Sequence, residues 1–294
     1  MDVIMKKYIY IILGMLMALS AHAASYTTVT IDNIGYRLYA ETMEAHVYHN
    51  KSGSLTVTDN RLVLPEKVTN DDKEYTVTEI EYFRCGNTNL TLVTPNSMKT
   101  VASVKSGVKT LVLSAGVTSV SDLSQSEHLE AFEIAEGNES FSIDDNGVLY
   151  SKDKTKLWFA SYGKRSSFGS YTVASTVTYI GPGAFYGFNN LETVSLPEGL
   201  KEIAEDAFNG CSKLVNCKLP STVETIGAKA FYNCAILGLT LPEQLRTIGN
   251  YAFRSGVQGD ALTSLAIPQY VENIGEYNQE IKGETNVEII PVIA

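Results

Sequence analysis

The stretch LPEGLKEIAEDAFNGC, residues 196–211, decides the fold of this chain because it recurs as LPSTVETIGAKAFYNC, residues 219–234. The second copy follows the first by 23 residues, and the apolar positions fit neither a helical stripe nor a strand alternation. A fixed period of this size is typical of repeat architectures, in which each unit buries its apolar face against its neighbours. The stretch therefore predicts a solenoid.

Three kinds of residue keep the same period between residues 171 and 275. The first is a phenylalanine, the second an isoleucine, and the third a proline that follows Leu or Ile. They stand at Phe185, Phe208, Phe231 and Phe253, at Ile180, Ile203, Ile226, Ile248 and Ile274, and at Pro197, Pro220, Pro242 and Pro268. Successive steps are 22, 23 or 26 residues. Three different residue types would not keep the same spacing by chance, so the period reflects a structural repeat.

Each unit begins with a strand pattern, L-x-x-V/L/C-x-L/I-P, as in LETVSLP, LVNCKLP, ILGLTLP and LTSLAIP. Its second and third apolar positions point to one face because they are two residues apart. The proline then ends the strand, since it cannot donate to a ladder. A second apolar pair follows, such as Leu200 and Ile203, and the glycine after the isoleucine, such as Gly227, suits a bend. Alanine and phenylalanine then close the coil in about one turn of helix or tight loop.

The remaining segments suggest a division of the chain. Residues 1–23 have a basic start, an apolar run and a small-residue ending, which is typical of a secretory signal peptide. We expect an N-terminal β cap over 24–60, a solenoid over 61–275 with a hairpin insertion near 144–162, and a C-terminal cap or tail over 276–294. The Asn146-Gly147 turn signal favours the hairpin. The mature chain is expected to be exported, with no transmembrane segment.

The repeat L-x-x-V-x-L-P-x-x-L/V-x-x-I-G-x-x-A-F-x-x-C resembles that of the BspA-like leucine-rich repeat family, common in secreted proteins of Bacteroidetes and spirochaetes. The match is strong over 171–275 and partial over 61–134. GVLYSKDKTKLWFASYG, residues 147–163, is similar to a hairpin that interrupts arrays of this family. The resemblance implies an exported solenoid with a parallel sheet along one side. It also implies adhesion or protein binding, at the cell surface, outside the cell or in the periplasm.

Catalytic and metal-binding patterns are scarce. His46 and His49 would face opposite sides of a strand because they are three residues apart. The DDNG segment over residues 144–147 begins like a calcium loop but lacks the acidic residue at its end, so a turn is expected. The formal net charge of −10 argues against general nucleic-acid binding. We therefore expect no cofactor, no metal and no enzyme activity.

The four cysteines are Cys85, Cys211, Cys217 and Cys234. Cys217 occupies a strand position filled by Val194 in the preceding unit, which predicts a core residue. Cys211 and Cys234 are equivalent positions of adjacent coils. Export would permit a disulfide between them. We expect unpaired thiols because directly stacked side chains point the same way.

The remaining candidate for a functional site is the outer face of the first strand in each coil. Its outward residues are small and mostly uncharged, and a partner could approach them closely. They are Thr193, Ser195, Asn216, Lys218, Gly238, Thr240, Ser264 and Ala266. Extended faces of solenoids bind partners, so this face predicts binding of a protein or another surface macromolecule. Two alternatives are a structural module of the cell envelope and a glycan-active enzyme whose carboxylates are brought together by the hairpin and the N-terminal cap.

Overall fold

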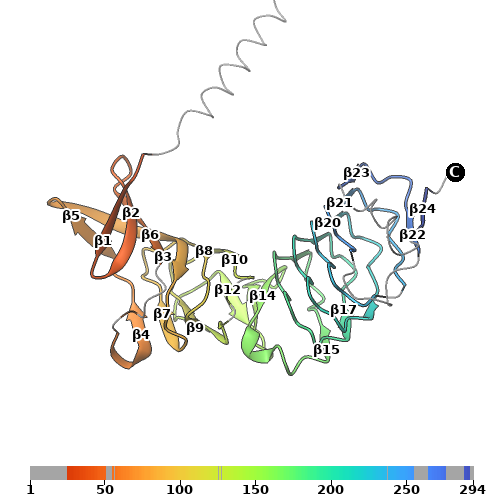
Figure 1. Ribbon diagram of the computed structural model, residues 1–294, viewed down its shortest axis with the longest axis horizontal. Coiled ribbons are helices and arrows are strands. Elements are labelled where there is room, and N and C mark those ends of the chain that lie inside the picture. The colour runs from red at the N-terminus through yellow and green to blue at the C-terminus, as the bar shows by residue number, and fades with distance from the viewer. Residues whose placement is uncertain are drawn as a thin grey trace, which may run out of the picture.

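The computed structural model describes residues 25–50, 55, 57–124, 126, 128–236, 238–254, 264–275 and 288–291. The expected signal peptide lies outside these residues. The described chain forms an arch, with the N-terminal segments at one end and the last strands at the other (Figure 1). Almost all of its regular structure is β, and two short 3-10 turns, η1 (Thr58–Asn60) and η2 (Tyr162–Lys164), are its helical elements.

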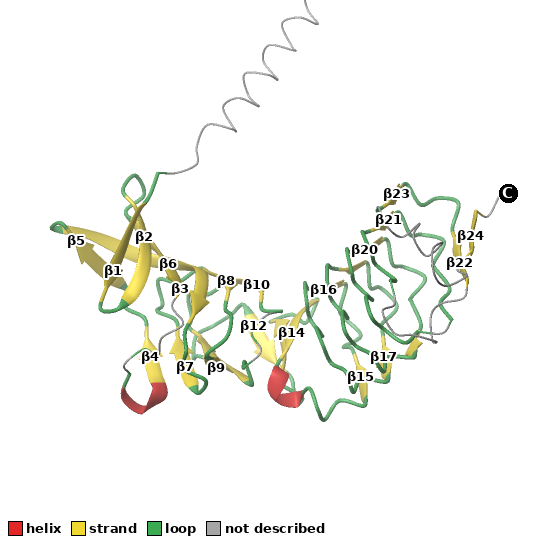
Figure 2. Cartoon of the chain, in the orientation of Figure 1, coloured by secondary structure: helices red, strands yellow, loops and turns green. Residues whose placement is uncertain are grey.

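The strands of the coils form two rows, which Figure 2 shows along the concave and convex edges of the arch. The strands of the concave edge are called the inner row. They are β6 (Lys73–Arg84), β8 (Thr100–Ser103), β10 (Ser119–Asp122), β12 (Phe141–Ile143), β14 (Lys156–Ala160), β16 (Tyr179–Ile180), β18 (Glu202–Ile203), β20 (Thr225–Ile226), β21 (Thr247–Ile248) and β23 (Asn273–Ile274).

The strands of the convex edge are called the outer row. They are β4 (Arg61–Val63), β7 (Leu90–Val93), β9 (Val108–Leu113), β11 (Ala131–Ile134), β15 (Ser170–Thr172), β17 (Thr193–Ser195), β19 (Asn216–Cys217), β22 (Ser264–Ile267) and β24 (Glu288–Pro291). Within each sheet of a row the neighbouring coil strands pair in parallel, as in β15–β17–β19 and β16–β18–β20–β21–β23. The predicted solenoid fold is therefore confirmed, with a second sheet formed by the residues around the repeated isoleucine.

Antiparallel strands join the array in two places. At the N-terminal end, β1 (Thr27–Ile31), β2 (Ile34–Tyr39) and β3 (Glu44–Asn50) form a meander, and β3 pairs in parallel with β6. The strand β5 (Lys67–Asn70) pairs antiparallel with β6. In the middle, β13 (Val148–Ser151) lies between β12 and β14 and is antiparallel to both.

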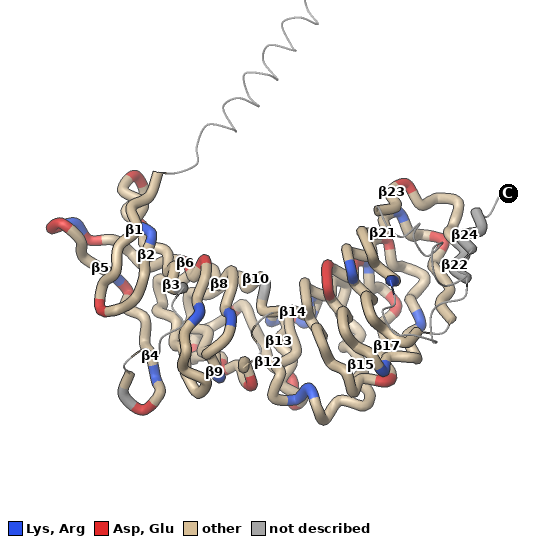
Figure 3. The backbone as a smooth tube through the Cα atoms, in the orientation of Figure 1, with Lys and Arg blue, Asp and Glu red and all other residues tan. Residues whose placement is uncertain are grey.

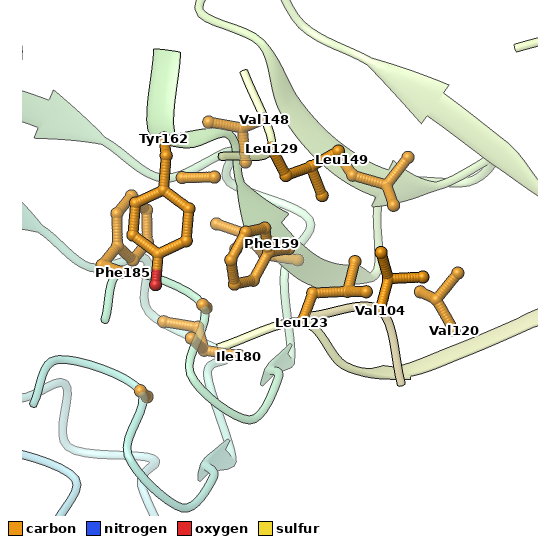
Figure 4. Close-up of a cluster of buried hydrophobic side chains, with 14 of the residues drawn as sticks. Val104, Val120, Leu123, Leu129, Val148, Leu149, Phe159, Tyr162, Ile180 and Phe185 are labelled. Carbon is orange, nitrogen blue, oxygen red and sulfur yellow. The ribbon is translucent and has the colours of Figure 1, made fainter. Parts of the chain in front are cut away.

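The core is one continuous cluster of buried apolar side chains that runs from Ile34 to Ile267. The central hairpin takes part in it: Figure 4 shows Phe159 of β14 packed among side chains such as Leu123 and Ile180, which come from the coils on either side. In the coil of residues 191–211, Leu196 is partly buried, whereas the other repeated apolar residues at irregular gaps are buried. They are Leu191, Val194, Leu200, Ile203, Ala207, Phe208 and Cys211. One solenoid circuit thus explains the unusual spacing.

The four repeated phenylalanines form a stack along the core. Phe185, Phe208, Phe231 and Phe253 are 0%, 0%, 2% and 5% exposed. Neighbouring ring centroids lie 5.3, 5.2 and 5.7 Å apart, with interplanar angles of 3°, 7° and 6°. The repeated phenylalanines are therefore buried in one continuous stack, in which each ring covers the face of the next.

The glycine that follows the repeated isoleucine has a different role from the bend we expected. A Cβ at Gly249 would lie 2.2 Å from the backbone nitrogen of Ala228, and one at Gly227 would lie 2.4 Å from that of Glu205. Both contacts are with the backbone of the preceding coil. Glycine at residues 227 and 249 therefore lets two coils approach closely, whereas Ala204 occupies the equivalent position after Ile203.

The turn before each phenylalanine contains a residue in the left-handed conformation. Gly183, Asp206, Lys229 and Tyr251 have φ values of 61°, 57°, 52° and 57°, and each stands two residues before its phenylalanine. Residues other than glycine pay about 1–2 kcal/mol there because the Cβ crowds the following carbonyl. Three of the four coils thus tolerate strain in order to keep the turn.

Replacing Lys229 with glycine is expected to stabilise the protein. Relief of the left-handed strain exceeds the larger backbone entropy that glycine loses on folding, which leaves a gain of up to about 1 kcal/mol. Lys229→Ala is the matched control, since it removes the same side chain but keeps the Cβ. Chemical denaturation should show a higher free energy of unfolding for Lys229→Gly but not for Lys229→Ala. Equal stability of the two variants would contradict strain at residue 229.

Candidate functional site

The predicted outer face borders an open depression of about 900 Å³. It extends over three successive coils of the outer row, at β17, at β19 and at the residues that follow Gly238. Six of the eight predicted residues line it. They are Thr193, Ser195, Asn216, Lys218, Gly238 and Thr240. The other two, Ser264 and Ala266, lie on β22, and their side chains are outside the described part of the structure.

Parallel pairing explains why these residues come together. Thr193 of β17 is paired with Asn216 of β19, and the Asn216 amide Nδ2 lies 3.4 Å from the Thr193 hydroxyl. A Cβ added to Gly238 would meet no atom within 4 Å, so the depression is open above this position. The floor offers hydroxyl, amide and backbone groups on a surface with little side-chain bulk.

The rim of the depression adds apolar and charged groups. Val215, at its edge, is 38% exposed, which is high for a large apolar side chain. Glu198 accepts a hydrogen bond of 3.2 Å from the Ser221 hydroxyl, and both residues line the depression. Lysine and acidic residues are interspersed along the whole arch, as Figure 3 shows. The surface therefore suits a partner that makes mixed polar and apolar contacts.

Three cysteines lie beneath this face as core residues. The Cys211 thiol donates to the carbonyl of Phe185 at 3.2 Å, and the Cys234 thiol donates to that of Phe208 at 3.1 Å. Each thiol is thus directed at the backbone of an earlier coil. Burial raises the pKa of the Cys217 thiol to about 12, which keeps it protonated and unreactive at neutral pH.

The two candidate histidines face opposite sides of β3, as expected. His49 is buried and stacks on Phe83, with ring centroids 5.3 Å apart. His46 is half-buried, and its Nδ1 lies 2.8 Å from Glu81 Oε1. Among the described residues, no group of three or more His, Cys, Asp or Glu side chains is arranged to hold a metal ion.

A polar cluster around Glu81 joins the N-terminal meander to the solenoid. Besides His46, the Glu81 carboxylate accepts a 2.6 Å hydrogen bond from the Tyr39 hydroxyl and pairs with Arg37. The Arg37 guanidinium lies 3.7 Å from the centroid of the Tyr48 ring. Burial raises the pKa of Glu81, but the hydrogen bonds outweigh it and hold that pKa below its usual value. Arg37, Tyr39 and His46 of the meander thus converge on one carboxylate of β6, so the cluster is a structural link.

The DDNG segment forms the expected turn. The backbone nitrogens of Asn146 and Val148 both donate to Asp144 Oδ1 at 2.9 Å. The other carboxylate oxygen of Asp144 accepts from the hydroxyl of Tyr171 at 2.7 Å. Asp144 therefore fixes the hairpin to the neighbouring outer-row strand.

The two rows of stacked strands and the repeated core define the class of the molecule as a parallel β solenoid of leucine-rich repeats. Residues 160–281 match the family model described as BspA type leucine rich repeat region, in six copies. This repeat region is of the BspA type, as the sequence resemblance indicated. No curated protein matches the chain significantly. No helix among the described residues is long and apolar enough to span a membrane.

Several solved structures are similar to the chain. The pneumococcal vaccine antigen PcpA is 18% identical, with 90% of this chain and 99% of that chain covered and a TM-score of 0.40. A leucine-rich repeat protein from Eubacterium ventriosum is 16% identical, with 92% and 97% covered and a TM-score of 0.38. The T. pallidum leucine-rich repeat protein is 23% identical, with 48% and 64% covered and a TM-score of 0.35.

Proposed function

We propose that this protein is a non-enzymatic binding module that is exported and holds a protein partner on its outer row. The observation that supports this most is the depression of about 900 Å³ over the predicted face, to which three coils contribute. We also propose the division of the chain into a signal peptide, an N-terminal cap, a solenoid and a C-terminal cap, with the boundaries given above.

The chemistry of the depression favours a protein over a small molecule. Small-molecule sites are enclosed, mostly apolar cavities, whereas this depression is open and its floor is largely Thr, Ser, Asn and Gly. A non-obligate protein interface, taken as a whole, is only about as apolar as the rest of the protein surface, so a mixed polar and apolar lining suits it. Val215 and the partly buried Leu196 supply apolar surface within the depression, while Glu198, Lys218 and Glu243 supply charge.

Simultaneous replacement of Thr193, Asn216 and Thr240 with arginine is expected to abolish partner binding without unfolding the protein. A few central residues carry most of the energy of an interface, and three bulky cations would occupy its centre. Exposed substitutions change stability by only about half a kcal/mol each, with some added repulsion between the like charges. Partners would come from a binding screen of purified cell-envelope and host proteins.

The matched control carries arginine at three exposed positions elsewhere, Thr28, Thr30 and Ser175. It adds the same charge away from the depression and should bind the partner normally. Both variants should show the melting profile of the unmodified protein. Unaltered affinity of the outer-face variant would contradict the proposed site. The hairpin, residues 148–160, would then be the next candidate binding site.

A further inference from the structure

The inner row contains a seam at the centre of the arch. The strand β10 ends one sheet and β12 begins the next, and the two are not hydrogen-bonded to each other. An open depression of about 490 Å³ lies at this seam. Thr118 precedes β10 and lines one side. The other side is lined by Glu139 and Ser140, which precede β12, and by residues of β13, β14 and the turn between them. The depression is therefore on the opposite row from the proposed protein site.

Trp158, the single tryptophan of the chain, lies in this depression. It is half-buried, and its indole nitrogen is covered without an acceptor among the described residues. What this side chain offers to a ligand is therefore carbon surface. Tyr179 of β16 continues the aromatic surface, with ring centroids 5.9 Å apart and an interplanar angle of 67°.

Polar groups surround the aromatic surface. Apart from Trp158, every residue that lines the depression is polar or charged. They include Glu139, Ser140, Ser151, Lys152, Asp153 and Lys156. The two lysines balance the two carboxylates, so the rim has no net charge. The Lys156 ammonium lies 5.5 Å from the Trp158 ring centroid and 5.9 Å from that of Tyr179, so a donor stands beside both rings.

One of the rim acceptors is held in place. Asp153 Oδ1 accepts hydrogen bonds from the Ser151 hydroxyl at 2.6 Å, the Thr155 backbone nitrogen at 3.0 Å and the Thr155 hydroxyl at 2.9 Å. The Ser151 hydrogen bond, followed by those from Thr155, lowers the pKa of Asp153 to about 2. The carboxylate is thus charged at every physiological pH, and its second oxygen is available as an acceptor.

An aromatic surface within a ring of donors and acceptors matches few ligand classes. An apolar ligand would need mostly apolar walls, and an anionic ligand would need an excess of cations. A sugar ring has a face of C–H groups that packs on an aromatic ring and an edge of hydroxyls that both donate and accept. We propose that the seam binds a neutral saccharide, stacked on Trp158 and hydrogen-bonded to the rim. This site goes beyond the proposed protein-binding function and is independent of it.

The single tryptophan makes the test direct, because selective excitation reports on Trp158 alone. The mature protein is titrated with maltotriose, cellotriose, mannotriose and chitotriose as neutral probes. At least one should change the Trp158 emission in a saturable manner. By calorimetry, Trp158→Ala should weaken that binding at least about tenfold, the usual scale for loss of a central aromatic contact. Trp158→Phe, which keeps a ring, should retain part of the affinity and the melting temperature.

Tyr270→Ala is the matched control, since Tyr270 is an exposed aromatic residue, 55% accessible, far along the chain from the seam. It should bind the probe normally, and so should the triple arginine variant of the outer row. The failure of the protein-binding proposal would therefore leave the saccharide proposal standing, and the reverse also holds. The saccharide proposal is overturned if none of the four probes changes the emission of the folded protein. Equal affinity of Trp158→Ala, or binding at the seam of a peptide only, would also overturn it.

Discussion

Replacing Phe208 with alanine is expected to lower the free energy of unfolding by about 3–5 kcal/mol. Phe208 is fully buried and stacks on rings in both neighbouring coils, at 5.3 Å and 5.2 Å between centroids. Its removal leaves a cavity that the stacked coils cannot close, because their spacing is fixed by backbone hydrogen bonds such as Phe208 N to Ala230 O at 2.8 Å.

Phe253→Ala is the internal comparison for this effect. Phe253 has one ring neighbour in the described stack, Phe231, and is 5% exposed. In a solenoid each repeat is stabilised by its nearest neighbours, so this variant should lose less stability than Phe208→Ala. Urea denaturation of both variants measures the difference. Equal losses, or a loss below about 1 kcal/mol at Phe208, would contradict a stack that couples adjacent coils.

The second large effect is expected from Gly249→Ala, which adds only one methyl group. That group would lie 2.2 Å from the Ala228 nitrogen and 2.5 Å from the Gly227 carbonyl carbon. These atoms belong to the backbone of the preceding coil, so relief requires the two coils to separate. Overpacking usually costs about 1–3 kcal/mol, and contact with backbone rather than a flexible side chain favours the upper end.

Gly169→Ala is the matched control, since a Cβ at Gly169 would meet no atom within 4 Å. This substitution should change stability by less than about half a kcal/mol. Thermal unfolding of the two variants under the same conditions separates steric crowding from the general effect of replacing a glycine. A small change at Gly249 would mean that the coils are not as close as the structure indicates.

Much of the fold could be predicted from the sequence because the repeat is visible in it. The period, the buried phenylalanines and the core position of Cys217 all follow from residues that recur at equal steps. The second sheet was missed because its strands, such as Glu202–Ile203, are only two residues long and show no alternation. The left-handed turns were missed for a related reason, since Asp206, Lys229 and Tyr251 occupy a position where glycine would have given the signal.

The candidate sites differ in how far the sequence could lead to them. Thr193 and Asn216 share a face because parallel strands repeat the same register. The spacing between repeats is enough to predict this shared face from the sequence. The surroundings of Trp158 depend on the missing hydrogen bonds between β10 and β12 and on the packing of the hairpin against β16. No local pattern encodes these tertiary relations, and Trp158 in the sequence is indistinguishable from a core residue.

Hydrogen–deuterium exchange on the complex with a protein partner tests the central claim most directly, because it reports which row of strands the partner covers. We expect slower exchange over residues 193–198, 215–221 and 238–243, with little change on the inner-row strands β18, β20 and β21. Protection confined to the inner row, with unchanged exchange at β17 and β19, would contradict binding at the outer face.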